Sequence, residues 1–129
     1  KIDHVAVAVR NLEEQIRFYE TVFGLRCGGV EEIPDQKVRV AVFPVGEVRI
    51  ELLEPTSADS PVAKFLEKRG EGLHHLAFLV DDLEAALEKA AAAGVELVDK
   101  KPRLGEGGKR IAFLHPRSTS GVLTELCER

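Results

Sequence analysis

The feature that most restricts the fold of this chain is an internal repeat. Residues 1–24 (KIDHVAVAVRNLEEQIRFYETVFG) and 72–94 (GLHHLAFLVDDLEAALEKAAAAG) carry the same residue types in the same order, at a constant offset of 71 positions. The matching pairs are His4/His75, Ala6/Ala77, Val9/Val80, Leu12/Leu83, Glu13/Glu84 and Ile16/Leu87. Six matches in one register predict two copies of one structural module.

Each copy has the pattern of a strand followed by a helix. The helical periodicity ends at Gly24 in the first copy and at Gly94 in the second. Shorter extended runs follow between glycine, proline and charged turns, at 26–31, 37–44 and 47–54 and then at 95–98, 110–115 and 121–127. The predicted fold class is α+β, with the unit βαβββ used twice.

The repeat also predicts the organisation of the chain. We expect modules over 1–56 and 73–129, joined by a helical connection over 57–72, and together forming one domain. Within the connection, the pattern predicts a short helix from Pro61 to Arg69 with Ser60 as its N-cap.

Composition narrows the classes of function. A chain of 129 residues, 44% hydrophobic and 31% charged, can bury one sizeable core as a soluble globular protein. A net charge of −4 argues against nucleic acid and an anionic membrane surface as partners. No apolar run approaches the roughly 20 residues of a membrane span and no signal peptide is recognisable, so we expect a cytoplasmic protein. Cys27 and Cys127 are expected to be reduced structural thiols.

Strand parity separates the adjacent histidines of the second copy. Alternate residues of a strand face opposite sides of the sheet, so His4 shares a face with Ala6 and His75 shares a face with Ala77. Small neighbours leave room beside both imidazoles. His74 lies on the opposite face, where a packing or capping role is expected.

Two glutamates recur in the last strand of each module. RIELLEP contains Glu51 and LTELCER contains Glu125, which follow His4 and His75 by 47 and 50 residues. A lone glutamate in such a strand is usually an edge residue facing solvent, and this alternative stays open for each. If the paired units curve into a cup, its concave face collects two imidazoles and two carboxylates. These ligands suit a divalent ion with two open positions, whereas a closed structural zinc site would favour thiolates.

The chain resembles the vicinal oxygen chelate superfamily and, within it, the methylmalonyl-CoA epimerases. The resemblance spans IDHVAVAV, FYETVFGL, IELLEP, GLHHLAFLVDDLEAAL and PRLGEGGKRIAFLHPRSTSGVLTEL. The last motif is the most specific and contains Gly107, Phe113, His115, Pro116 and Gly121. The implied fold is a cupped mixed β-sheet around a metal site, and the implied ligands are His4, Glu51, His75 and Glu125.

The resemblance implies an activity as well. This is the interconversion of (R)- and (S)-methylmalonyl-CoA by removal and return of the C2 proton through a metal-stabilised enolate. It implies Glu125 as a base, one divalent ion and a homodimer. We expect Co²⁺, with Mn²⁺, Ni²⁺ or Zn²⁺ as alternatives, and favour Co²⁺ or Mn²⁺ over Zn²⁺ because the substrate needs two open positions. Some relatives carry a second base at the position of Val40, so we expect Glu51 to serve as the second base here.

The run DKKPRLGEGGKR (99–110) concentrates basic residues around a glycine-rich turn. Lys101, Lys109 and Arg110 are candidate contacts for the phosphates of coenzyme A, and a solvated hairpin is the alternative. The turn lacks a P-loop pattern. His115 precedes a proline at a strand end and is expected to be structural.

Other activities within the superfamily stay open. A glyoxalase I-type lactoylglutathione lyase would use a similar ligand set, but the specific C-terminal motif argues against it. A metal-free binding protein of the bleomycin-resistance type would need none of the four ligands. An extradiol dioxygenase would leave Glu51 without a role.

Overall fold

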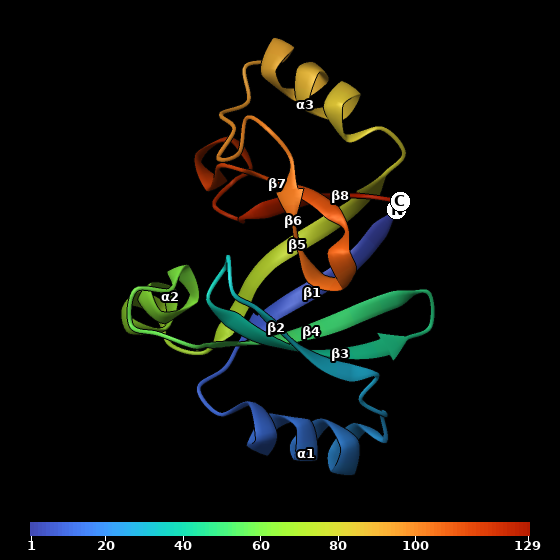
Figure 1. The fold of residues 1–129 in the computed structure, drawn as a ribbon, viewed down its shortest axis with the longest axis vertical. Helices are drawn as coiled ribbons and strands as arrows, with labels where there is room; N and C mark the ends of the chain where they lie inside the picture. Colours follow the sequence, from blue (N-terminus) through green and yellow to red (C-terminus); the bar gives the residue numbers. More distant parts are fainter. The chain divides into compact units, whose positions relative to one another are not determined.

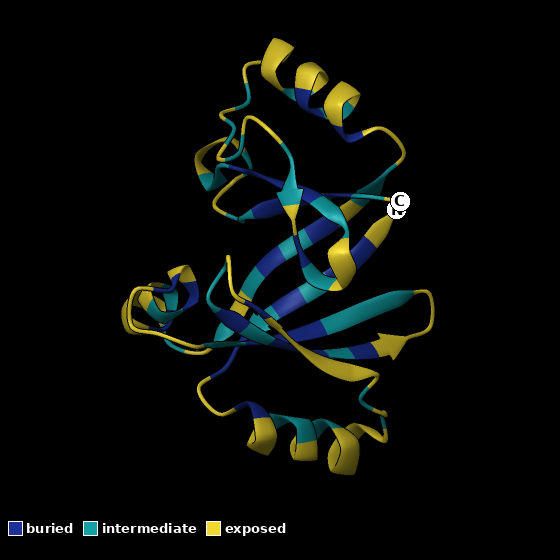
Figure 2. Cartoon of the chain, viewed as in Figure 1, coloured by how far each residue is buried: buried dark blue, intermediate teal, exposed yellow.

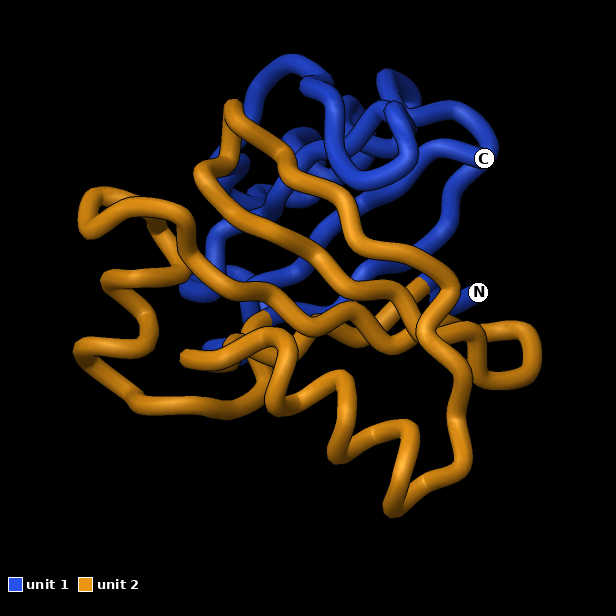
Figure 3. Tube along the Cα trace, turned by 60° about the horizontal axis from the view of Figure 1, so that its bottom comes forward, with its two compact units in different colours: residues 1–3, 75–129 blue, residues 4–74 orange.

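The computed structural model describes residues 1–129, and the chain divides into two compact units. One unit consists of His4–His74 and the other of Lys1–Asp3 together with His75–Arg129 (Figure 3). Each unit contains most of one copy of the repeat, and the element order confirms the predicted α+β fold of two βαβββ modules. The boundaries 1–56, 57–72 and 73–129 follow the sequence repeat rather than this division, and they stay a prediction.

The first unit has four strands and two helices (Figure 1). Its elements are β1 (Ile2–Ala8), α1 (Leu12–Phe23), β2 (Gly29–Ile33), β3 (Val38–Val45), β4 (Val48–Pro55) and α2 (Pro61–Arg69). The strand order is β2-β3-β4-β1, with β1 parallel to β4 and the other neighbours antiparallel. The first residues of β1 belong to the other unit, so this strand is shared.

Helix α1 covers one face of this sheet. It begins where the side chain of Asn11 accepts a hydrogen bond from the backbone N–H of Glu14, and it ends at Gly24, whose φ of 65° is left-handed. The helix contributes Leu12, Ile16 and Tyr19 to a core that contains Ala41, Phe43 and Leu52. The outward side of α1 is exposed (Figure 2).

Helix α2 packs against the opposite face of this sheet. Val62 and Leu66 of α2 pack in one cluster with Ala8 and Leu53. The bounds of α2 are those predicted from the sequence, because Ser60 caps the N–H of Val62 and proline occupies the first turn.

The second unit repeats the plan. Its elements are β5 (Gly72–Val80), α3 (Leu83–Ala92), β6 (Arg103–Leu104), β7 (Arg110–Leu114) and β8 (Thr124–Glu128), with 3₁₀ turns at Glu106–Gly108 and Pro116–Ser118. The strand order is β5-β8-β7-β6, with β5 parallel to β8. Leu83 and Leu87 of α3 pack against Ala112, Leu114 and Leu126. No helix combines the length and the hydropathy that a membrane span requires.

Two predicted extended runs of the second module are wrong in detail. Residues 95–98 form no strand and make only a single bridge, between Leu97 and Leu114, and the edge strand β6 comes later. The reason is that the N–H groups of Val98 and Asp99 both donate to the carbonyl of Phe113, a bulge-like arrangement that interrupts the ladder after one bridge. The run predicted at 121–127 begins as β8 only at Thr124, after a turn.

Candidate metal centre

The first predicted ligand pair lies on the sheet face that α1 does not cover. In the register of β1 with β4, Ala6 is opposite Glu51, and His4 lies two residues before Ala6 on the same face. The Nδ1 atom of His4 is 3.4 Å from Oε2 of Glu51. Both side chains are only 4% exposed. The alternative of a solvent-facing edge residue is therefore wrong for Glu51.

A cation that the sequence analysis missed accompanies this pair. Arg49 is directly opposite His4 in the β1–β4 register, and its Nη2 atom is 3.6 Å from Oε2 of Glu51. The parity argument that selected Glu51 would also have selected Arg49, two residues earlier in the same strand. A permanent positive charge therefore stands beside the first pair.

The second pair repeats the first in the other unit. Ala77 is opposite Glu125 in the β5–β8 register, as Ala6 is opposite Glu51 in the first unit. Nε2 of His75 is 3.2 Å from Oε1 of Glu125, and these side chains are 6% and 5% exposed. The solvent-facing alternative is therefore wrong for Glu125 as well.

Burial also controls the protonation of the second imidazole. Desolvation disfavours the charged form and lowers the pKa of His75 from 6.5 to about 3. His75 is therefore neutral at pH 7, and one of its nitrogens has a lone pair to offer. The ring of Phe113 stands edge-on to the imidazole, with the centroids 5.2 Å apart.

Within each pair, the separation of the donor atoms fits two ligands of one ion. Two donor atoms about 2.1 Å from one metal are roughly 3.0 Å apart at a 90° angle and roughly 3.4 Å apart at a tetrahedral angle. The observed 3.4 Å and 3.2 Å match this range and exceed the roughly 2.7–2.9 Å of a charge-assisted hydrogen bond. A buried carboxylate also needs a compensating positive charge. The donor set of each pair therefore fits a divalent metal.

Val40 lies on the same face as Glu51 and is buried. It is opposite Leu53 in the β3–β4 register, and Leu53 lies two residues after Glu51 on the same face. Val40 packs in the cluster with Val62 of α2. No titratable group stands at this position. The nearest carboxylate by register is that of Glu31 on β2, which is directly opposite Val40.

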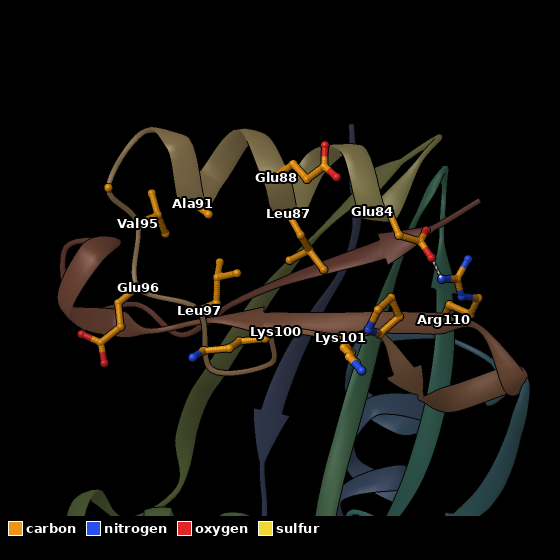
Figure 4. A pocket seen from close by; sticks show the side chains of 12 residues that line it. Glu84, Leu87, Glu88, Ala91, Val95, Glu96, Leu97, Lys100, Lys101 and Arg110 are labelled. Atoms are coloured by element: carbon orange, nitrogen blue, oxygen red, sulfur yellow. Dashed lines mark hydrogen bonds and ion pairs between the residues drawn. The ribbon is translucent and has the colours of Figure 1, made fainter.

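The three predicted coenzyme A contacts lie in different surroundings. Lys101 lines an open groove between α3 and the segment 94–102, together with Arg110 (Figure 4). Nζ of Lys109 is 3.4 Å from Oδ1 of Asp3. The substrate role of all three stays a prediction.

Arg110 has a structural partner set that repeats in the first unit. It pairs with Glu84 of α3 and Glu128 of β8, and the equivalent Arg39 pairs with Glu13 of α1 and Glu54 of β4. The offset of 71 links Arg39 to Arg110, so the sequence repeat already contained this signal. Arg110 therefore lies on the α3 side of its sheet.

The remaining histidines, His74 and His115, make packing and capping contacts. His74 makes an edge contact with the ring of Phe65, with the centroids 4.9 Å apart. His115 accepts a hydrogen bond at Nδ1 from the backbone N–H of Arg117 and thereby caps a 3₁₀ turn. Cys27 and Cys127 form no disulfide.

Comparison with known proteins places this geometry in a family. Residues 3–113 match the family model described as Glyoxalase/Bleomycin resistance protein/Dioxygenase superfamily. An uncharacterised protein of Bacillus subtilis (strain 168) is 49% identical over 99% of this chain and 91% of its own length. An ethylmalonyl-CoA/methylmalonyl-CoA epimerase of Cereibacter sphaeroides is 37% identical over 98% of this chain and 96% of its own length.

Solved structures give the same answer. A methylmalonyl-CoA epimerase in complex with methylmalonyl-CoA and NH4+ superimposes with a TM-score of 0.96 and 39% sequence identity, over 99% of this chain and 93% of that chain. The paired βαβββ modules are therefore those of the vicinal oxygen chelate fold. The chain belongs to the glyoxalase/bleomycin resistance protein/dioxygenase superfamily and, within it, to the methylmalonyl-CoA epimerase family.

Proposed function

We propose that this chain is a metal-dependent epimerase that interconverts (R)- and (S)-methylmalonyl-CoA. The observation that carries the proposal is the repetition of one buried His–Glu pair in equivalent positions of both modules. The comparisons support the same activity, because relatives that match over nearly their whole length are named as epimerases of that substrate.

We further propose that both pairs hold one divalent ion, with His4, Glu51, His75 and Glu125 as its ligands. When bound, the ion would offset the negative charge that grows on the thioester oxygen as the C2 proton leaves. The neutral state of His75 supports this role, because a protonated imidazole cannot ligate. Cobalt, a homodimer and a cytoplasmic location remain predictions.

The proton steps fall to the two carboxylates. We assign the removal of the C2 proton to the carboxylate of Glu125, which lies 3.2 Å from Nε2 of His75. We assign the return of a proton to the carboxylate of Glu51, which lies 3.4 Å from Nδ1 of His4. Two carboxylates on opposite sides of C2 would give inversion, because each can act as acid or base.

The test is deuterium incorporation at C2. Metal-loaded protein in D₂O should exchange the C2 proton of methylmalonyl-CoA and equilibrate its epimers, and chelator should abolish both. Lactoylglutathione formation is measured on the same sample. Lactoylglutathione formation without C2 exchange would replace the proposed function with the glyoxalase-type activity.

A further inference from the structure

Arg103 lies on the same sheet face as Glu125. It is opposite Ile111 in the β6–β7 register, and Ile111 shares its face with Phe113, which is opposite Glu125 in the β7–β8 register. Arg110, the first residue of β7, faces the opposite side of the sheet from Ile111, which is the side that α3 covers. Of these two arginines, only Arg103 is on the side of the second ligand pair.

An aromatic ring links Arg103 to that pair. The guanidinium carbon of Arg103 is 5.6 Å from the centroid of the Phe113 ring, within the range of a cation–π contact. The same ring stands edge-on to His75. Phe113 therefore positions a permanent cation close to the second ligand pair without neutralising it.

Arg103 also has an unused hydrogen-bond donor. Its Nε atom is buried and has no hydrogen-bond partner in the protein. Oδ1 of Asp99 is 3.4 Å away, longer than a charge-assisted hydrogen bond, and Oδ2 of Asp99 accepts from the N–H of Phe113. Asp99 thus holds the arginine in place, while the side chain remains 36% exposed and accessible to a ligand.

We propose that Arg103 is a substrate-binding residue whose guanidinium pairs with the carboxylate of the acyl group. The inference rests on the proposed function, because it requires a malonyl-type thioester at His75 and Glu125. A guanidinium presents its donors as a planar fork that matches both oxygens of a carboxylate. Arg103 would then select acyl-CoA thioesters that carry a free carboxylate over those that do not.

Binding of three unreactive or slowly reacting probes tests this assignment. Malonyl-CoA has both the carboxylate and the nucleotide, acetyl-CoA lacks the carboxylate, and malonyl-pantetheine lacks the nucleotide. We expect Arg103→Gln to weaken malonyl-CoA and malonyl-pantetheine by about 10- to 100-fold, as for a lost bond to a charged group, and to leave acetyl-CoA unchanged. Arg103→Lys should give an intermediate loss, because it keeps the charge without the fork.

Arg39→Gln is the matched control. Its side chain is 34% exposed and pairs with glutamates, but it belongs to the first unit and lies on the side that α1 covers. This variant should bind all three probes as the wild type does. Metal content and thermal unfolding of each variant show whether the fold and the ion are retained.

Two results would overturn the inference. One is an unchanged affinity of Arg103→Gln for malonyl-CoA. The other is a loss shared by malonyl-CoA and acetyl-CoA but not by malonyl-pantetheine, which would assign the arginine to the nucleotide phosphates. Failure of the proposed function is a separate result, seen as a metal-loaded wild type that does not epimerise methylmalonyl-CoA.

Discussion

At the scale of single residues, the carboxylates of Glu51 and Glu125 have two duties in the proposed reaction, ligation and proton transfer. Replacing either with glutamine keeps a neutral oxygen for the metal and removes the proton acceptor. We expect Glu51→Gln and Glu125→Gln to retain metal and to lose at least about 100-fold in turnover, as is typical when a general base is removed. Turnover and metal content are measured on the same preparations.

Exchange with solvent deuterium separates the two carboxylates further. With one base missing, the enzyme should still exchange the C2 proton of one epimer while failing to complete inversion. Near-wild-type turnover of metal-loaded Glu51→Gln would mean that the second base is elsewhere. Glu31, opposite Val40 in the β2–β3 register, would then be the next residue to replace.

The lowered pKa of His75 predicts a dependence of stability on pH. Below pH 6.5 the unfolded chain binds a proton at this residue, whereas the folded chain does not until the pH reaches about 3. The free energy of unfolding is therefore unaffected by this residue's titration above pH 6.5. As the pH falls from 6.5 towards 3, it decreases by about 1.4 kcal/mol per pH unit. Denaturant unfolding of metal-free protein should show the stability gap between wild type and His75→Asn narrowing over this window. A gap that stays constant would contradict the assignment.

At the scale of elements, the repeat includes the starts of both helices. The first N–H of α1, at Leu12, donates to Oε2 of Glu54, and that of α3, at Leu83, donates to Oε2 of Glu128. Each bond is 2.9 Å long and joins a helix to the last strand of its own module. A negative carboxylate at a helix N-terminus is also favourable to the helix dipole.

The cap of α3 gives a prediction at this scale. Oδ1 of Asp82 accepts from the N–H of Ala85, so Asp82→Ala should reduce the free energy of unfolding by about 1 kcal/mol. Asp81→Ala is the control, because the Asp81 side chain is 86% exposed and pairs only with an exposed arginine. Denaturant titration compares the two. Equal losses would show that the cap contributes nothing specific.

The sequence predicts elements well where local chemistry decides them. Ser60 and Pro61 determine the start of α2, and strand parity places the His–Glu pairs. It fails at 95–98, because the bonds of that segment to Phe113 join residues far apart in the chain. The face of Arg103 was not predictable either. The number of residues in the glycine-rich turn between β6 and β7 decides which β6 residue faces which side of the sheet.

At the scale of the whole molecule, the proposal of one shared ion makes a stoichiometric prediction. Elemental analysis of loaded protein should give one divalent ion per chain. Replacing either His4 or His75 with alanine should remove most of that ion, because a metal held by four ligands loses affinity when any one is deleted. Two independent sites would instead give two ions per chain and would lose only one of them in each variant.

Because β1 is shared between the units, cutting the chain between them should separate residues that one unit needs to fold. Lys1–Asp3 complete the second unit, where the carbonyl of Lys1 accepts from the N–H of Leu79 and Asp3 faces Lys109. A chain cut after Gly70 would therefore leave the fragment 71–129 without three of its unit's residues, all carried by the other fragment. We expect 71–129 alone to be poorly folded by circular dichroism and to fold when 1–70 is added. The nicked protein should elute as one species in size-exclusion chromatography, because residues 1–3 of one fragment complete the unit formed by the other.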